Sequence, residues 1–350
     1  MFLRREQPSK LLFAKFARRA LNVADRPQYS AAASQSRCRD VRAFAVAAQP
    51  SYISGMLIPT RPSSPVSTPL WNARLLLVER ATEDAKACAD WYAALLDDPV
   101  TEIAHGVWQV RGADRWMLFR TGTHKTVPVI AFAFPTQAEW AAYRAHLEAI
   151  GVELHAVAVE LQALLGEHTF GLRDPDRRMI LFCVVPDAAS AQTVTHITLP
   201  ARLQHFVCAS TQTLAMLEFY RDKLGFIESD RVLDTDGDLS SAFVRSDTEH
   251  HSFAVFRAPQ PGADHHAYEV PNWNAIRDWA DHCGDLEIPI WWGPGRHGVG
   301  NNLFFMIEDP DGYKVEFSAE LELMTADQIY RTWPHGPRAL NLWGNAWMRS

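Results

Sequence analysis

The stretch GPGRHGVGNNLFFMIEDPDGYKVEFSAE, residues 293–320, decides the fold. An apolar run ends at the turn sequence DPDG, and a second run follows it, which predicts two strands joined by a tight turn. The second strand carries an acid, Glu316, among apolar neighbours. A buried carboxylate needs a partner such as a base or a metal ion, so this hairpin points to a functional site.

Working outward from the hairpin, the same order of elements occurs twice along the chain. The first set comprises strand 73–79, helix 84–96, strands 107–111, 115–120 and 127–134, helix 136–151, and two strands within 170–185 around a DPD turn. The second set comprises strand 203–210, helix 213–226, strands 240–247, 251–258 and 265–270, helix 274–284, and the hairpin within 303–320. A repeat of roughly 130 residues predicts two similar domains rather than a solenoid. Each would be an α+β pair of βαβββ units with a curved mixed sheet around a cavity.

These patterns divide the chain into four segments. We expect an extension at 1–69, a first domain at 70–190, a second at 198–325 and a C-terminal tail at 326–350 that covers the site. Residues 1–55 hold ten Lys or Arg and only three acids, which resembles an organelle transit peptide. The alternative, which we favour, is a disordered extension or a start codon placed upstream of a true start at Met56.

The composition excludes several classes of protein. A formal net charge of −7 argues against nucleic acid as a partner, because phosphate binding requires a basic face. The sequence has no apolar run long enough for a membrane span. Five scattered cysteines without a CxxC pair indicate a reducing compartment. We therefore expect a cytoplasmic protein, or a mitochondrial one if residues 1–55 are a transit peptide.

Three polar residues of the second half stand out on its strands. They are His205 on the first strand, His265 on a later strand and Glu316 on the last. Two imidazoles and one carboxylate are the facial set that holds non-haem Fe(II). Any one of them alone is an ordinary strand residue, but the first half provides an internal control, because Leu181 stands where Glu316 would fall after the matched turn.

The motifs LQHFVC, FYRDKLGF, HHSFAVF, DHHAYEV, GPGRHGVGNNLFFM and DPDGYKVEF together resemble the type I extradiol ring-cleaving dioxygenases of the vicinal-oxygen-chelate superfamily. The catechol and homoprotocatechuate 2,3-dioxygenases are the most similar members. The resemblance spans about residues 70–345 and is strongest in 200–318. It implies two tandem vicinal-oxygen-chelate domains, the first of them metal-free.

The resemblance also assigns roles to residues. It implies that His205, His265 and Glu316 ligate Fe(II), with Mn(II) as an alternative ion for the same ligands. His251 would be the acid–base histidine, with His250 as the fallback. His265 rather than His266 would face the metal, because adjacent strand residues point to opposite faces. His297 would be a second histidine near the substrate, and its alternative role is a loop residue that caps local backbone.

Two places depart from the family pattern. Met306 stands where a tyrosine is usual, and a thioether cannot donate a proton. Trp292 and Ala339 stand at two places where relatives that cleave carboxylated catechols use arginine, although Arg338 matches one family arginine. We therefore place Trp292, Met306 and Arg338 in the substrate pocket and expect a neutral or aryl-substituted catechol.

The predicted function is therefore ring cleavage of a catechol-type substrate with dioxygen at Fe(II). Met306 keeps alternatives open: a 4-hydroxyphenylpyruvate-type dioxygenase, a glyoxalase-like isomerase, or a non-catalytic protein that binds aromatic ligands. The expected partners are a small aromatic substrate and dioxygen, with neither nucleic acid nor membrane, and the family resemblance is compatible with a homo-oligomer.

Overall fold

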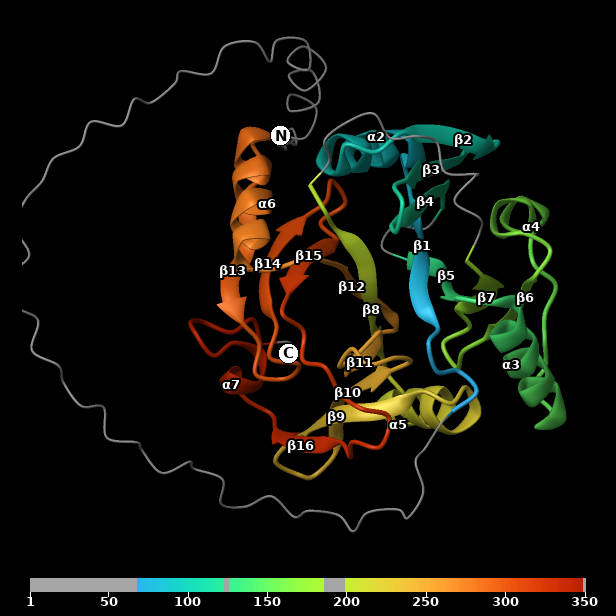
Figure 1. Ribbon diagram of the computed structural model, residues 1–350. Helices are drawn as coiled ribbons and strands as arrows, with labels where there is room; N and C mark the ends of the chain where they lie inside the picture. The colour runs from blue at the N-terminus through green and yellow to red at the C-terminus, as the bar shows by residue number, and fades with distance from the viewer. Residues whose placement is uncertain (1–67, 123–125, 186–198, 349–350) are drawn as a thin grey trace, which may run out of the picture. The chain divides into compact units, whose positions relative to one another are not determined.

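The computed structural model describes residues 68–122, 126–185 and 199–348 (Figure 1). The predictions about residues 1–67 and about the junction 186–198 lie outside the described residues. None of the helices in the described ranges is both long and apolar enough to cross a membrane.

The two halves of the chain contain the predicted elements and several further ones. The first half has β1 (Arg74–Thr82), α2 (Ala85–Leu96), β2 (Val100–Ala104), β3 (Val107–Arg111), β4 (Trp116–Thr121), β5 (Thr126–Phe134), α3 (Gln137–Ala149), α4 (Val159–Leu165), β6 (Thr169–Arg173) and β7 (Met179–Val184). The second half has β8 (Arg202–Ser210), α5 (Thr213–Glu218), the π-helical turn η2 (Phe219–Lys223), β9 (Ile227–Leu233), β10 (Leu239–Arg245), β11 (Phe253–Arg257), β12 (Gly262–Glu269), α6 (Trp273–Asp285), β13 (Ile290–Arg296), β14 (Leu303–Glu308) and β15 (Lys314–Ala319). The C-terminal segment adds β16 (Arg331–Pro334) and α7 (Pro337–Leu340).

The described strands form two mixed sheets with matching topology, which confirms the predicted α+β class. The first has the order β2-β3-β4-β1-β5-β7-β6 and the second β13-β14-β15-β12-β8-β11-β10-β9-β16. In the first sheet β1 pairs parallel to β4 and antiparallel to β5, which pairs parallel to β7. In the second, β8, β11, β12 and β15 repeat these relations. The first half departs from this pattern in one detail. Where the second half has β13, the described part of the first half has a single β-bridge between His155 and Gly171.

Helix α6 shows how sequence and packing fix the second sheet. Asn272 caps its N-terminus, because the Asn272 side chain accepts hydrogen bonds from the backbone of Asn274 and Ala275, as N-cap residues do. Its buried residues Ile276, Trp279 and Cys283 recur at helical spacing. Figure 1 shows α6 alongside β13, β14 and β15. The helix therefore covers one face of these strands and leaves the other face for the site.

Comparing the strand registers identifies the equivalent residues of the two halves. Ala131 on β5 pairs with Leu77 and with Leu181. In the same way, Ala267 on β12 pairs with His205 and with Glu316. Residues directly opposite each other on neighbouring strands share one face of the sheet. The polar set of the second half therefore occupies the position that apolar side chains occupy in the first half.

In the first half this position is a filled core. Leu77, Val129 and Leu181 are buried in one apolar cluster together with Leu161 and Leu165 of α4. Packing of α4 onto this face leaves it as ordinary hydrophobic core. Among the described residues, the first half therefore has packed apolar side chains where the second half has its polar set.

Buried ion pairs join the two halves at their DPD turns. Arg80 on β1 pairs with Asp309, and neither side chain is exposed. Tyr92 of α2 donates to the same carboxylate at 3.2 Å. The reciprocal contact is made by Tyr220 of η2, which donates to Asp174 of the first half at 3.2 Å. Each half thus satisfies a buried acid of the other.

Glu269, at the end of β12, is expected to make stability depend on pH. Burial, followed by the nearby Glu249, raises the pKa of Glu269 to about 8 from a usual 4.5. Between these values the folded state holds a proton that the unfolded chain has lost. The free energy of unfolding should therefore fall by about 2–4 kcal/mol between about pH 5 and pH 8.

Chemical denaturation of wild type and Glu269→Gln at both pH values measures this effect. In Glu269→Gln the free energy of unfolding should fall less between the two pH values than in wild type, because a neutral amide has no proton to release. The exposed Glu153 supplies the control, since Glu153→Gln should keep the wild-type dependence. An unchanged decline in Glu269→Gln would contradict the assignment.

Candidate metal centre

His205, His265 and Glu316 converge on one point of the second sheet. The two Nε2 atoms are 3.4 Å apart, and Glu316 Oε2 lies 3.9 Å from His205 Nε2 and 3.3 Å from His265 Nε2. All three residues are at most 5% exposed. Ligand atoms about 2.0–2.2 Å from one metal ion and at right angles to each other are roughly 3 Å apart. The arrangement therefore fits a facial set around a divalent ion.

Neighbouring groups set the protonation of these three residues. Burial lowers the pKa of His205 to about 3, which keeps its imidazole neutral. Burial opposes ionisation of Glu316, but hydrogen bonds from His265 and His297 outweigh it and hold the pKa of that carboxyl well below its usual range. Burial also lowers the pKa of His265, but Asp264 and Glu316 outweigh it and raise that pKa. A neutral imidazole and an ionised carboxylate are the forms that bind a metal ion.

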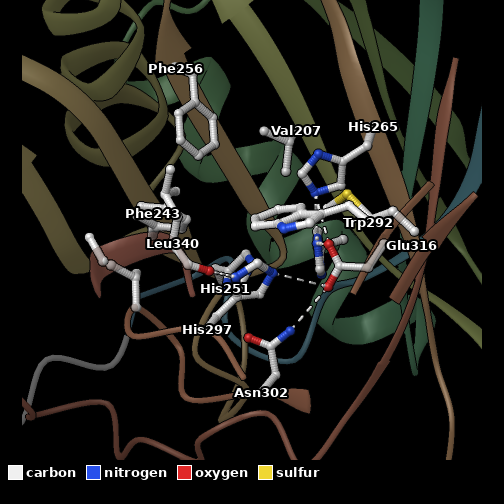
Figure 2. A pocket seen from close by; sticks show the side chains of 14 residues that line it. Val207, Phe243, His251, Phe256, His265, Trp292, His297, Asn302, Glu316 and Leu340 are labelled. Atoms are coloured by element: carbon white, nitrogen blue, oxygen red, sulfur yellow. Dashed lines mark hydrogen bonds and ion pairs between the residues drawn. The ribbon is translucent and has the colours of Figure 1, made fainter. Parts of the chain in front are cut away.

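Each of the three side chains has an orienting partner, and the sequence analysis missed these partners. The Nδ1 atom of His205 bonds with Gln204, and that of His265 lies 2.5 Å from Asp264 Oδ1. Asn302 donates to Glu316 Oε1 at 3.1 Å (Figure 2). Such partners fix the ring orientation and the tautomer of metal ligands. Two of them directly precede a ligand histidine in sequence, which is the signal that could have revealed them.

The structure separates the members of both histidine pairs. His251 lines the cavity, with its ring centroid 4.4 Å from that of His205. His250 is fully buried beside it, with the two Nδ1 atoms 3.0 Å apart. Burial, with His205 nearby, lowers the pKa of His251 well below its usual value. His251 is therefore the member of its pair that faces the centre.

The second pair divides in the same manner. His265 faces the centre, whereas His266 lies on the opposite side of β12, with Nδ1 3.4 Å from the hydroxyl of Tyr313. Burial, with Arg80 nearby, lowers the pKa of His266 well below its usual value. The alternation of side chains along a strand accounts for the separation.

The other predicted residues fall into two groups. His297, Trp292 and Met306 line the cavity. His297 Nε2 lies 3.7 Å from Glu316 Oε1, and its Nδ1 bonds with the carbonyl of Leu340. Arg338, in contrast, is exposed and does not line this cavity, because α7 turns its side chain toward solvent while the neighbouring Ala339 and Leu340 point inward.

The cavity beside the centre is small and mostly apolar. Besides the histidines and Glu316, its lining includes Val207, Phe243, Phe256, Trp292, Val299, Asn302, Met306, Ala339 and Leu340 (Figure 2). No Lys or Arg is among the described residues that line it. Its volume is about 30 Å³, which holds one or two water molecules. An aromatic ligand therefore requires the lining to move apart.

The C-terminal tail supplies part of this lining through Ala339 and Leu340. Its carbonyl at Ala339 accepts hydrogen bonds from the backbone of Gly298 and Val299. Trp292 Nε1 donates to the carbonyl of Asn345 at 2.9 Å. A few hydrogen bonds and apolar contacts therefore hold the tail over the cavity.

Comparisons with known proteins agree with this geometry. Residues 202–317 match the Glyoxalase/Bleomycin resistance protein/Dioxygenase superfamily. The chain is 27% identical over 261 residues to metapyrocatechase 2 of Cupriavidus necator, which covers 67% of this chain and 78% of that protein.

Two solved structures share the fold. The Mn(II)-bound glyoxalase of Novosphingobium aromaticivorans matches with a TM-score of 0.62 and 26% identity, over 78% of this chain and 91% of that one. The homoprotocatechuate 2,3-dioxygenase of Arthrobacter globiformis matches with a TM-score of 0.64 and 23% identity, over 83% and 93%. The family match falls on the half of the chain that carries the two histidines and the glutamate.

Proposed function

We propose that this protein, an extradiol dioxygenase of the glyoxalase/bleomycin resistance protein/dioxygenase superfamily, opens the ring of a neutral or aryl-substituted catechol with dioxygen. The observation that carries the proposal is the buried set of His205, His265 and Glu316 facing an apolar cavity. Two histidines and one carboxylate are the ligand set of non-haem Fe(II) oxygenases, and Mn(II) suits the same donors.

The ligand residues hold the ion, and when bound it supplies the Lewis-acid and electron-transfer chemistry that dioxygen requires. His251 has a ring nitrogen available to the cavity, and we assign it the removal of a proton from a catechol hydroxyl. Its low basicity in the buried site makes it suited to return that proton later. His297 and Asn302 hold Glu316 in place through its Oε1 atom. The apolar wall excludes water from the reacting groups.

The lining also determines which catechol fits. A carboxylate placed among Trp292, Phe243 and Met306 would lose its hydration without gaining a cationic partner, which is costly. An uncharged ring gains favourable burial against the same side chains. We assign the necessary widening of the cavity to the tail at Ala339 and Leu340, because these residues lie on the short helix α7 and not on a strand of the sheet.

Oxygen uptake by anaerobically iron-loaded protein tests the proposal. We expect uptake matched by a yellow ring-opened product, with kcat/KM at least about 10-fold higher for neutral than for carboxylated catechols, since an unpaired buried charge costs more than 1.4 kcal/mol. Equal rates for both classes would reject the assigned specificity. No uptake with any catechol by metal-containing protein would reject ring cleavage.

A second candidate is a glyoxalase-like isomerase, and one observation favours it. Met306 is buried in the cavity wall directly beside Glu316 across the β14–β15 pair, where it cannot donate a hydrogen bond to a substrate oxygen. Conversion of an α-keto aldehyde–thiol adduct without oxygen uptake would support this alternative.

A further inference from the structure

A buried polar chain leads away from the cavity behind His251. His250 Nε2 lies 3.1 Å from Asp230 Oδ2 on β9, and His250 Nδ1 lies 3.0 Å from His251 Nδ1. Asp230 and His250 are both fully buried, and His251 is 4% exposed. The chain thus runs from a carboxylate through two imidazoles to the cavity.

Asp230 in this chain is ionised. Burial by itself opposes ionisation, but hydrogen bonding from His250 and Arg331 outweighs it and lowers the pKa of Asp230. Arg331 donates to both carboxylate oxygens, and Trp333 Nε1 donates to Oδ2 at 2.9 Å. Both partners come from β16, so the C-terminal segment holds this carboxylate in place.

When the His250 imidazole is neutral, its contact with Asp230 sets the direction of the hydrogen bond between the two histidines. An ionised carboxylate only accepts, so the nitrogen of His250 that faces it carries the hydrogen. A neutral imidazole with hydrogen on Nε2 has a lone pair on Nδ1. In that state His251 Nδ1 donates to His250 Nδ1, which leaves the lone pair of His251 on Nε2. That is the nitrogen left for the cavity.

We propose that His250 and Asp230 are positioning residues that hold His251 in the tautomer whose Nε2 accepts a proton from the substrate. This inference rests on the proposed function, because it concerns how the acid–base histidine is kept ready. The packing requires no such chain, since an apolar side chain could fill the place of His250 without placing an imidazole between a buried carboxylate and His251. Imidazole in the opposite tautomer would present an N–H to the cavity and could not act as a base.

The test compares variants of the iron-loaded protein on the catechol that wild type turns over fastest. His250→Leu removes the contacts with Asp230 and His251 and should lower kcat about 10- to 100-fold, a part of the 10²–10⁴-fold that acid–base groups contribute. KM and bound iron should stay within about twofold, because His250 touches neither ligand nor cavity. His250→Gln keeps an amide oxygen that accepts and an amide nitrogen that donates, and should recover most of the loss.

Two further variants separate positioning from stability. His282→Leu removes a partly buried histidine that bonds to the carbonyl of Leu95 outside this chain, so its kcat should stay close to that of wild type. Asp230→Asn should lower kcat, and combining it with His250→Leu should lower kcat no further than the worse single variant, since residues that act as one unit are not additive.

Each outcome is decisive. Wild-type kcat in His250→Leu, or equal losses in His250→Leu and His282→Leu, would overturn the inference while the proposed function stands. Loss of iron in step with kcat would assign His250 a structural role and overturn it as well. Absence of turnover by wild type with every catechol would instead overturn the proposed function, and the inference with it.

Discussion

Glu316→Gln should release the metal ion and abolish turnover. The variant keeps the size of the side chain and its contact with Asn302, but it removes the one negative charge among the three ligands. Partners that only orient a ligand are worth about 10- to 100-fold in metal affinity, so loss of a ligand should exceed about 100-fold. Metal analysis after gel filtration, together with oxygen uptake, measures both effects. His265→Ala should behave in the same way.

Glu320→Gln is the matched control, because Glu320 directly follows β15 and pairs with Arg296 in a partly exposed contact. This variant should retain wild-type iron and activity. Full iron and full activity in Glu316→Gln would show that the assigned ligand set is wrong. Retained iron with lost activity would move Glu316 from ligand to another role in the chemistry.

Asp309→Asn should lower the free energy of unfolding by about 3–5 kcal/mol, which is the usual effect of removing one member of a buried ion pair. The amide oxygen can still accept from the turn backbone at Asp311 and Tyr313, as the carboxylate does. Arg80, with no exposed surface, would keep its charge but lose its main partner. Urea denaturation followed by fluorescence measures the change.

The neighbouring Glu308 provides the control for this prediction. Its side chain is 43% exposed and pairs with Lys314, so Glu308→Gln should change the free energy of unfolding by less than about 1 kcal/mol. Adding Arg80→Met to Asp309→Asn should restore part of the stability, because it removes the uncompensated charge. If Asp309→Asn changes the free energy of unfolding by less than about 1 kcal/mol, the ion pair with Asp311 alone is enough to stabilise the buried charge of Arg80.

The sequence by itself determined the duplication and the α+β class, and it singled out His205, His265 and Glu316, whose side chains the structure brings together. These features are readable because each depends on local patterns: turn residues in the DPD motifs, apolar runs on strands, and helices that end at glycine. The internal comparison of Glu316 with Leu181 was equally informative, because both follow the same turn. Strand β9 was missed, since Glu228, Asp230 and Arg231 interrupt its apolar pattern.

Only the tertiary structure decided how these residues are used. Asp230 of β9 is buried because Arg331, Trp333 and His250 reach it from distant segments, and no local pattern encodes such pairing. The same holds for α4, which fills the first half's equivalent of the site, and for Arg338, which faces solvent. Sequence periodicity reports which face of a strand is buried, whereas strand register and packing decide what meets that face, and those depend on contacts between residues far apart in the chain.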